Sequence, residues 1–177
     1  MHSFLLLKKH TLMVCFFISF NYFGIRLVHK MKLNNKNRAI LLISGLVLFF
    51  NFNLLIIQAQ EAHEKAALKV FLRIEEGISD AAVKKFSKYF GNKNYLSLSN
   101  GVSGYYSTNQ SYYVINDFLS IYQPTSFKLT NIVTDTETPF ASGILKYNSK
   151  GVRGSSIVFI SLHFIDGEWK ISQITIN

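Results

Sequence analysis

Cysteine is nearly missing from this chain, because Cys15 is the only one among 177 residues. Cys15 lies in an N-terminal segment that we expect the finished protein to lose, so the remainder should have neither a disulfide bond nor a reactive thiol. A glycine-rich phosphate loop, a nucleophile elbow and a Cys/His cluster are missing as well. His63 and His163 are widely separated, so they do not suggest a metal site. We therefore expect no cofactor and no metal.

Acidic residues are absent from the first 60 positions, where seven of the 19 lysines and arginines lie. The formal net charge of +9 comes mainly from this part, and the rest of the chain carries twelve basic against ten acidic side chains. A nearly balanced domain lacks the clustered basic face that nucleic acid requires. We therefore expect no nucleic-acid partner.

One long apolar run, Ala39–Ile57, follows a basic segment that begins at Met31. A basic start, an apolar middle and a small residue at the end, here Ala59, are the parts of a secretory signal peptide. We therefore predict a signal peptide at residues 31–59 and a single domain at residues 60–177, which is 118 residues long. The domain should be exported, to the periplasm or the extracellular space.

Residues 1–30 contain a second apolar stretch that is too short to span a bilayer. We interpret them as an over-extended N-terminus, because Met31 opens a complete signal peptide of its own. The alternative is a membrane anchor formed by an uncleaved N-terminal helix, since Ala39–Ile57 is nearly long enough to cross a bilayer. Two asparagines within that run weigh against the anchor, because unpaired amides in hydrocarbon are costly.

The first half of the domain has the apolar spacing of helices. We predict one helix over Glu61–Glu76, ended by Gly77, and a second over Asp80–Phe90. A short strand, Tyr95–Ser99, and a loop over Asn100–Gly104 follow. The third helix opens with the capping box Ser107-Thr108-Asn109-Gln110 and stops at Pro124. Lys84, Lys85 and Lys88 of the second helix are interpreted as a solvated face, with a docking patch as the alternative.

The second half is rich in Ile, Val, Phe and Thr and is typical of strands. We predict strands over Phe127–Val133, Phe140–Tyr147, Ser155–Ile165 and Trp169–Ile176. The segment IVFISLHFI within the third strand is apolar on both faces, as in the central strand of a covered sheet. Helices followed by an antiparallel meander predict an α+β fold.

Several residues share the pattern of a known family. They are Gly104-Tyr105-Tyr106-Ser107, Gln110, Ile115, Phe118, Phe127, Gly143-Ile144-Leu145 and Arg153. With this pattern, Ala67–Ile176 resembles the nuclear transport factor 2-like superfamily and, within it, a small exported family known as domain of unknown function 4783. The resemblance implies N-terminal helices packed on a strongly curved antiparallel sheet, a cystatin-like or nuclear transport factor 2-like cone that encloses a pocket.

Carboxylates are absent from the four long predicted strands. Superfamily enzymes of the ketosteroid isomerase type need a carboxylate base inside the cone and hydrogen-bond donors at the developing oxyanion. Asp135, Glu137, Asp166 and Glu168 all fall in predicted turns. We therefore predict no catalytic residue and favour a binding module over an enzyme.

Four residues are candidates for ligand binding in such a pocket. His163 shares a strand face with Ile157 and is a candidate acid or base lining the pocket. The alternative is that it is an ordinary hydrogen-bonded packing residue. Arg153 lies on the same alternation, and at the mouth of a cone its guanidinium would hold an anionic ligand through two hydrogen bonds; the alternative is an exposed or ion-paired strand start. Tyr106 and Tyr113 are candidates for the lining of a ligand cavity or a partner surface, or for ordinary core and rim positions. Trp169 is expected to pin the hairpin that precedes it.

These observations favour an exported, non-catalytic binding or interaction module that engages a small apolar ligand or a protein partner. One alternative is a small pocket enzyme, an isomerase or lyase that uses His163 and a tyrosine. Another is a structural homodimer, since such sheets pair face to face within the superfamily.

Overall fold

The computed structural model describes residues 35–177, so the interpretations of residues 1–30 and of Cys15 concern a part of the chain outside the described residues. The chain divides after Ile56, and Ile57–Asn177 forms a compact unit. The helical elements are α2 (Asn35–Ser79), the short 3₁₀ helices η1 (Val83–Lys85) and η2 (Ser87–Tyr89), and α3 (Thr108–Ile121). The strands are β1 (Phe90–Leu98), β2 (Ser103–Tyr106), β3 (Gln123–Val133), β4 (Phe140–Ser149), β5 (Val152–Ile165) and β6 (Glu168–Ile176).

Helix α2 contains both the predicted helix Glu61–Glu76 and most of the predicted signal peptide. Within residues 35–177, no helix combines the length and the hydropathy that a membrane crossing requires.

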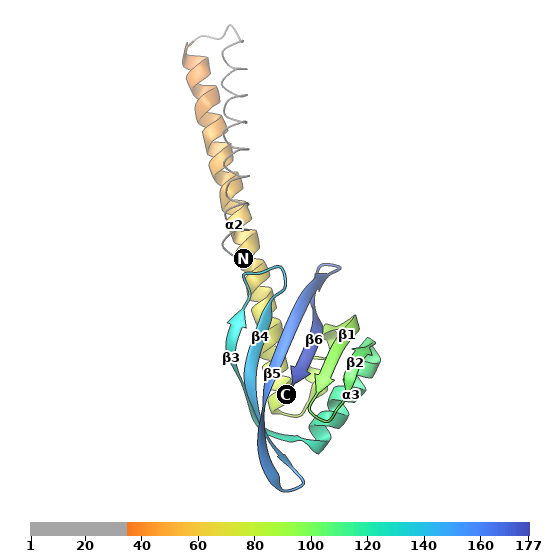
Figure 1. Cartoon of the computed structure of the whole chain (residues 1–177). Coiled ribbons are helices and arrows are strands. Elements are labelled where there is room, and N and C mark those ends of the chain that lie inside the picture. The colour runs from red at the N-terminus through yellow and green to blue at the C-terminus, as the bar shows by residue number, and fades with distance from the viewer. Residues whose placement is uncertain (1–34) are drawn as a thin grey trace. The chain divides into compact units, whose positions relative to one another are not determined.

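The six strands form one sheet in the order β2-β1-β6-β5-β4-β3 (Figure 1). The meander from β3 to β6 is antiparallel, as predicted, whereas β1 lies parallel to β6. Strand β1 is longer than the predicted Tyr95–Ser99, and its antiparallel partner β2 lies partly in the stretch predicted to be a loop. The sheet is thus mixed at one side, where the chain returns to it from the helices.

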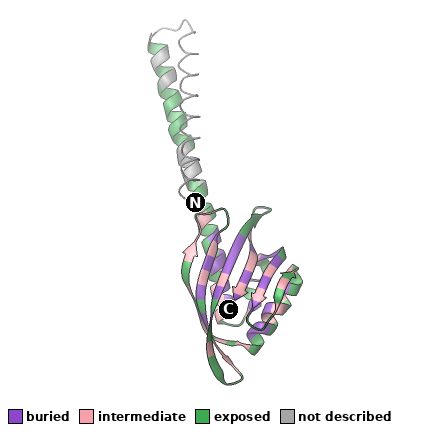
Figure 2. Ribbon diagram, in the orientation of Figure 1, coloured by how far each residue is buried: buried purple, intermediate pink, exposed green. Residues whose placement is uncertain are grey.

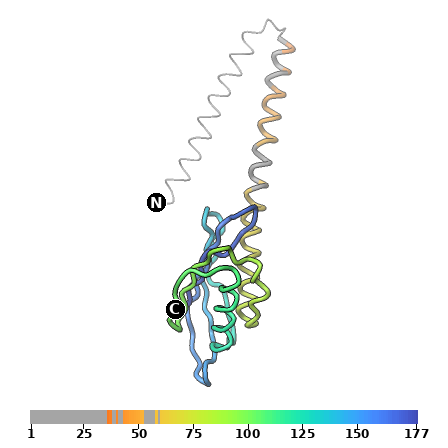
Figure 3. The backbone as a smooth tube through the Cα atoms, turned by 90° about the vertical axis from the view of Figure 1, so that its right-hand side faces the viewer, coloured from red at the N-terminus to blue at the C-terminus, as the bar shows by residue number. Residues whose placement is uncertain are grey.

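Helices α2 and α3 lie on one side of the sheet (Figure 3) and fill that face with large apolar side chains. The largest fully buried residues are Phe71, Phe86, Phe118, Phe127, Ile74, Ile78, Leu96, Ile115, Leu119, Leu145, Ile160 and Leu162. Figure 2 shows buried residues along the central strands. The face of the sheet that meets the helices is therefore a packed hydrocarbon core.

The other face of the sheet is only partly covered. On β5, Val158, Ile160 and Leu162 are fully buried, but Ile157, directly before them, is 65% exposed. The prediction that β5 is covered on both faces is therefore wrong for its outward side. Alternation along the strand sends Ile157 and Phe159 away from the helices.

Helix α2 ends at Ser79, three residues later than predicted, and the reason is a Schellman ending rather than Gly77. Ala81 adopts a left-handed conformation with φ of 52°, and the Ala82 amide donates to the Gly77 carbonyl at 2.7 Å. Gly77 instead permits close packing, because a Cβ there would lie 2.3 Å from the Phe86 ring. The predicted second helix, Asp80–Phe90, is replaced by η1 and η2.

The predicted capping box of the third helix is confirmed. The Ser107 hydroxyl accepts from the Gln110 amide, and the Gln110 side chain accepts from the Ser107 amide at 2.9 Å. This fixes the first turn of α3. The helix then buries Ile115, Phe118 and Leu119 against the sheet.

A buried asparagine joins β1, β2 and α3. Asn94 is fully buried, accepts from the Gly91 amide at 2.8 Å and donates to the Gly91 carbonyl and the Ser111 hydroxyl at 2.8 and 2.9 Å. The pairing of β1 with β6 shifts register between Phe90 and Tyr95, where this network lies. The segment Gly91–Asn94, which lies between the predicted second helix and the predicted strand Tyr95–Ser99, is therefore an irregular part of β1.

We predict that Asn94→Ala lowers the free energy of unfolding by about 2–3 kcal/mol, because buried donors and acceptors lose their partner. The exposed neighbour Asn92 offers the control Asn92→Ala, which should change it by less than about 0.5 kcal/mol. Urea unfolding followed by circular dichroism measures both. Equal effects of the two substitutions would contradict a special role for the Asn94 network.

Candidate functional site

The four residues predicted to bind a ligand do not meet in one place. Arg153 and His163 lie near opposite ends of β5, and ten residues of strand span roughly 30 Å. Both side chains are exposed. Tyr106 ends β2 and is half-buried, whereas Tyr113 lies on α3 and is 64% exposed, with its ring edge-to-face against Tyr112.

The pocket implied by the cone is filled where α2 and α3 meet the sheet. Phe71 from α2, Phe118 from α3 and Phe127 from β3 are each fully buried in one cluster. His163 and Arg153 share the alternation of the outward residue Ile157, so they lie away from this cluster. This cluster therefore leaves no room for a ligand between the helices and the sheet.

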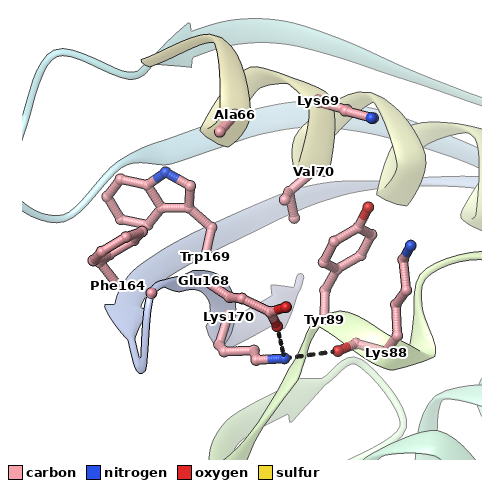
Figure 4. Close-up of a pocket in the computed structure, with 10 residues that line it drawn as sticks. Ala66, Lys69, Val70, Lys88, Tyr89, Phe164, Glu168, Trp169 and Lys170 are labelled. Carbon is pink, nitrogen blue, oxygen red and sulfur yellow. Dashed lines mark hydrogen bonds and ion pairs between the residues drawn. The ribbon is translucent and has the colours of Figure 1, made fainter. Parts of the chain in front are cut away.

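One candidate site is a cleft of about 420 Å³ between α2, η2 and the hairpin that joins β5 to β6 (Figure 4). We call it the hairpin cleft. It is lined by Ala66, Lys69, Val70, Lys88, Tyr89, Phe164, Gly167, Glu168, Trp169 and Lys170. Its volume lies within the range of roughly 300–1,000 Å³ that is typical of small-molecule sites.

Trp169 holds the hairpin against α2 and forms an apolar wall of the cleft. Its indole nitrogen donates to the His63 carbonyl at 3.0 Å. The rings of His63 and Phe164 lie 4.5 and 5.1 Å from the Trp169 ring, centroid to centroid. Trp169 is 4% exposed. The expectation that it pins the hairpin agrees with this geometry, and the indole held in this way lines the cleft.

Three lysines and one glutamate provide the charge of the cleft. The Lys170 ammonium donates to the Glu168 carboxylate at 2.6 Å and to the Lys88 carbonyl at 3.2 Å. The Lys170 hydrogen bond and charge, with a smaller effect of Lys88, hold the pKa of Glu168 below its ordinary value. Glu168 therefore stays ionised at neutral pH and compensates one of the three cations.

The other two cations are less constrained. Within the described part of the chain, no carboxylate forms an ion pair with Lys69 or Lys88. The Lys88 ammonium lies 5.0 Å from the centre of the Tyr89 ring, a cation–π contact. The cleft thus combines aromatic surface with uncompensated positive charge.

The chemistry available in the cleft is that of binding. Lysine ammonium groups attract and hydrogen-bond anions, and rigid aromatic walls take up apolar groups. Among residues 35–177, no group of His, Cys, Asp and Glu has the arrangement of a metal site. The sequence pattern missed this site because Lys69 and Lys88 come from separate helices and meet Trp169 only through the fold. Of the lysines interpreted as a solvated face, Lys88 lines the cleft.

The fold is shared with solved structures. A DUF4783 family protein from Bacteroides uniformis is 21% identical with a TM-score of 0.54, over 59% of this chain and 93% of that chain. A DUF4783 family protein from Bacteroides ovatus is 20% identical with a TM-score of 0.52, over 59% and 90%. The protein named "Rd1NTF2_04 with long sheet" is 12% identical with a TM-score of 0.51, over 63% and 99%. The domain therefore has the α+β architecture of the nuclear transport factor 2-like class.

A family match makes the assignment narrower. Residues 71–177 match the model described as Domain of unknown function (DUF4783). The chain belongs to this family, as the resemblance in the sequence implied. No curated protein matches the chain in sequence.

We predict that Trp169→Phe loosens the hairpin, because the bond to the His63 carbonyl is lost while an aromatic ring is kept. Amide hydrogens of residues 164–170 should exchange faster, by about the fivefold to twelvefold that corresponds to a bond of 1–1.5 kcal/mol. Hydrogen exchange with mass spectrometry measures this. The control is Tyr113→Phe on α3, which should leave the hairpin unchanged, and unchanged exchange in Trp169→Phe would show that the bond does not anchor the hairpin.

Proposed function

We propose that this protein is an exported, non-catalytic binding module whose ligand occupies the hairpin cleft. The observation that carries the proposal is the contrast between the packed core under the helices and the hairpin cleft. The side of the sheet under the helices is filled by phenylalanine and aliphatic side chains, whereas the hairpin cleft has room for a small molecule. Its mixed apolar and cationic lining suits recognition of a ligand.

Export is part of the same proposal and rests on the sequence. The basic start, the run Ala39–Ile57 and the small residue Ala59 have the order of a secretory signal peptide. An uncleaved leader that anchors the domain is the alternative. The mass of the chain recovered from cells distinguishes the two.

Pairing of two copies is a second candidate, and one observation favours it. On the outward face of the sheet, Ile144 of β4 pairs with Ile157 of β5, and these side chains are 45% and 65% exposed. Phe140 and Phe159 stack beside them with ring centroids 5.9 Å apart. An exposed apolar cluster of this kind gains stability when a second surface covers it.

The test is native mass spectrometry of the protein recovered from the envelope fraction of its host, compared with its denatured mass. We expect a chain that begins near Gln60 and an extra mass that is lost on denaturation. Ala66→Phe, which fills the cleft, should abolish the extra mass, because Ala66 lines the space that the ligand occupies. Leu72→Phe, at an exposed position of α2 that does not line the cleft, should retain it.

Two results would count against the proposal. An extra mass that persists in Ala66→Phe would show that the ligand binds outside the hairpin cleft. The absence of an extra mass in every sample would show that the protein retains no ligand. A doubled mass without a ligand would support the paired form instead. A chain that keeps its leader would support the anchored alternative.

A further inference from the structure

The hairpin cleft has two chemically different ends. In Figure 4 the rings of Trp169 and Phe164 lie at one end, and the ammonium groups of Lys69 and Lys88 lie at the other, beside Tyr89. The apolar end is rigid, because the indole is bonded to α2 and packed against Phe164. A ligand that matches both ends must be apolar at one end and charged at the other.

The sign of that charge follows from the ion pairs. Lys170 is already bonded to Glu168 at 2.6 Å, so this pair contributes little net charge. Lys69 and Lys88 have no ion-pair partner within the described residues, and they leave their end of the cleft positive. Positive charge in a partly enclosed site attracts an anion more strongly than the same charge in open water.

The tight turn of the hairpin forms part of the cleft lining. Gly167 lines the cleft in a left-handed conformation with φ of 83°, which side chains other than glycine rarely adopt. Asp166, with φ of 51°, completes the tight turn between β5 and β6. The tight turn therefore favours glycine at this position of the cleft lining.

We infer that the ligand of the hairpin cleft is an amphiphilic organic anion, with its apolar body against Trp169 and its anionic group between Lys69 and Lys88. This inference rests on the proposed function and adds the chemical class of the ligand. It assigns Lys69 and Lys88 the role of anion-binding residues. The adjacent lysines Lys84 and Lys85 do not line the cleft and have no part in it.

Trp169 is the only tryptophan of the chain, so it reports on the cleft directly. The full-length protein is labelled with fluorotryptophan and titrated with naphthoate, and the single fluorine resonance is followed by NMR. Naphthamide, which has nearly the same shape but no charge, is the matched probe. We expect a saturating shift with naphthoate and binding of naphthamide weaker by about tenfold, since charge-assisted hydrogen bonds are the stronger ones.

The double variant Lys69→Gln/Lys88→Gln should weaken naphthoate binding by about tenfold and leave naphthamide binding unchanged. Lys84→Gln/Lys146→Gln removes the same charge from exposed sites outside the cleft and is the matched control. It should change naphthoate binding by less than about twofold, because exposed charges that are distant from the ligand are screened by salt.

Three outcomes would overturn the inference, and they differ in what else they affect. Equal binding of naphthoate and naphthamide would refute the anion preference while leaving the cleft as a binding site. An equal loss in the two double variants would refute the specific role of Lys69 and Lys88. If neither probe moves the Trp169 resonance, the hairpin cleft is no site for a small amphiphile, and the proposed function fails with it.

Discussion

The structure depends on the covering of one apolar sheet face by α2 and α3. Strands β3 to β6 and β1 direct their alternate side chains to this face, and the helices meet them with Phe71 and Phe118. A polar site among these closely packed rings would be costly, since a buried polar group needs a hydrogen-bond partner that hydrocarbon side chains cannot supply. Asn94, a polar side chain that the fold does bury, makes its hydrogen bonds within the chain.

Because the core is packed with apolar side chains, the candidate binding site lies at the edge of the domain core. At the hairpin between β5 and β6, Trp169 covers the edge of the core and is fixed to α2 through the His63 carbonyl. The same indole forms a wall of the hairpin cleft, so the residue that completes the core also shapes the site. Lys69 and Lys88 then add charge from helices that are in place only because the core is formed.

Much of the fold could be predicted from the sequence, and the candidate site could not. Hydrophobic periodicity and the capping box at Ser107 are local signals, so they located the α3 start and the four long strands. The left-handed Ala81 and the irregular pairing near Asn94 depend on tertiary contacts, and the predicted helix Asp80–Phe90 therefore became two 3₁₀ turns. Likewise, the cleft joins residues that are about a hundred positions apart, such as Ala66 and Trp169, and no spacing rule connects them.

The central claim is that ligands bind at the hairpin cleft and not in the core between the sheet and the helices. Its most direct test is a crystal structure of the full-length protein soaked with bromonaphthoate, in which the anomalous signal of bromine locates the probe. The account predicts a bromine peak between Ala66 and Trp169. A peak among Phe71, Phe118 and Phe127 would contradict it, because it would mean that the packed core opens to form the pocket that the cone architecture implied.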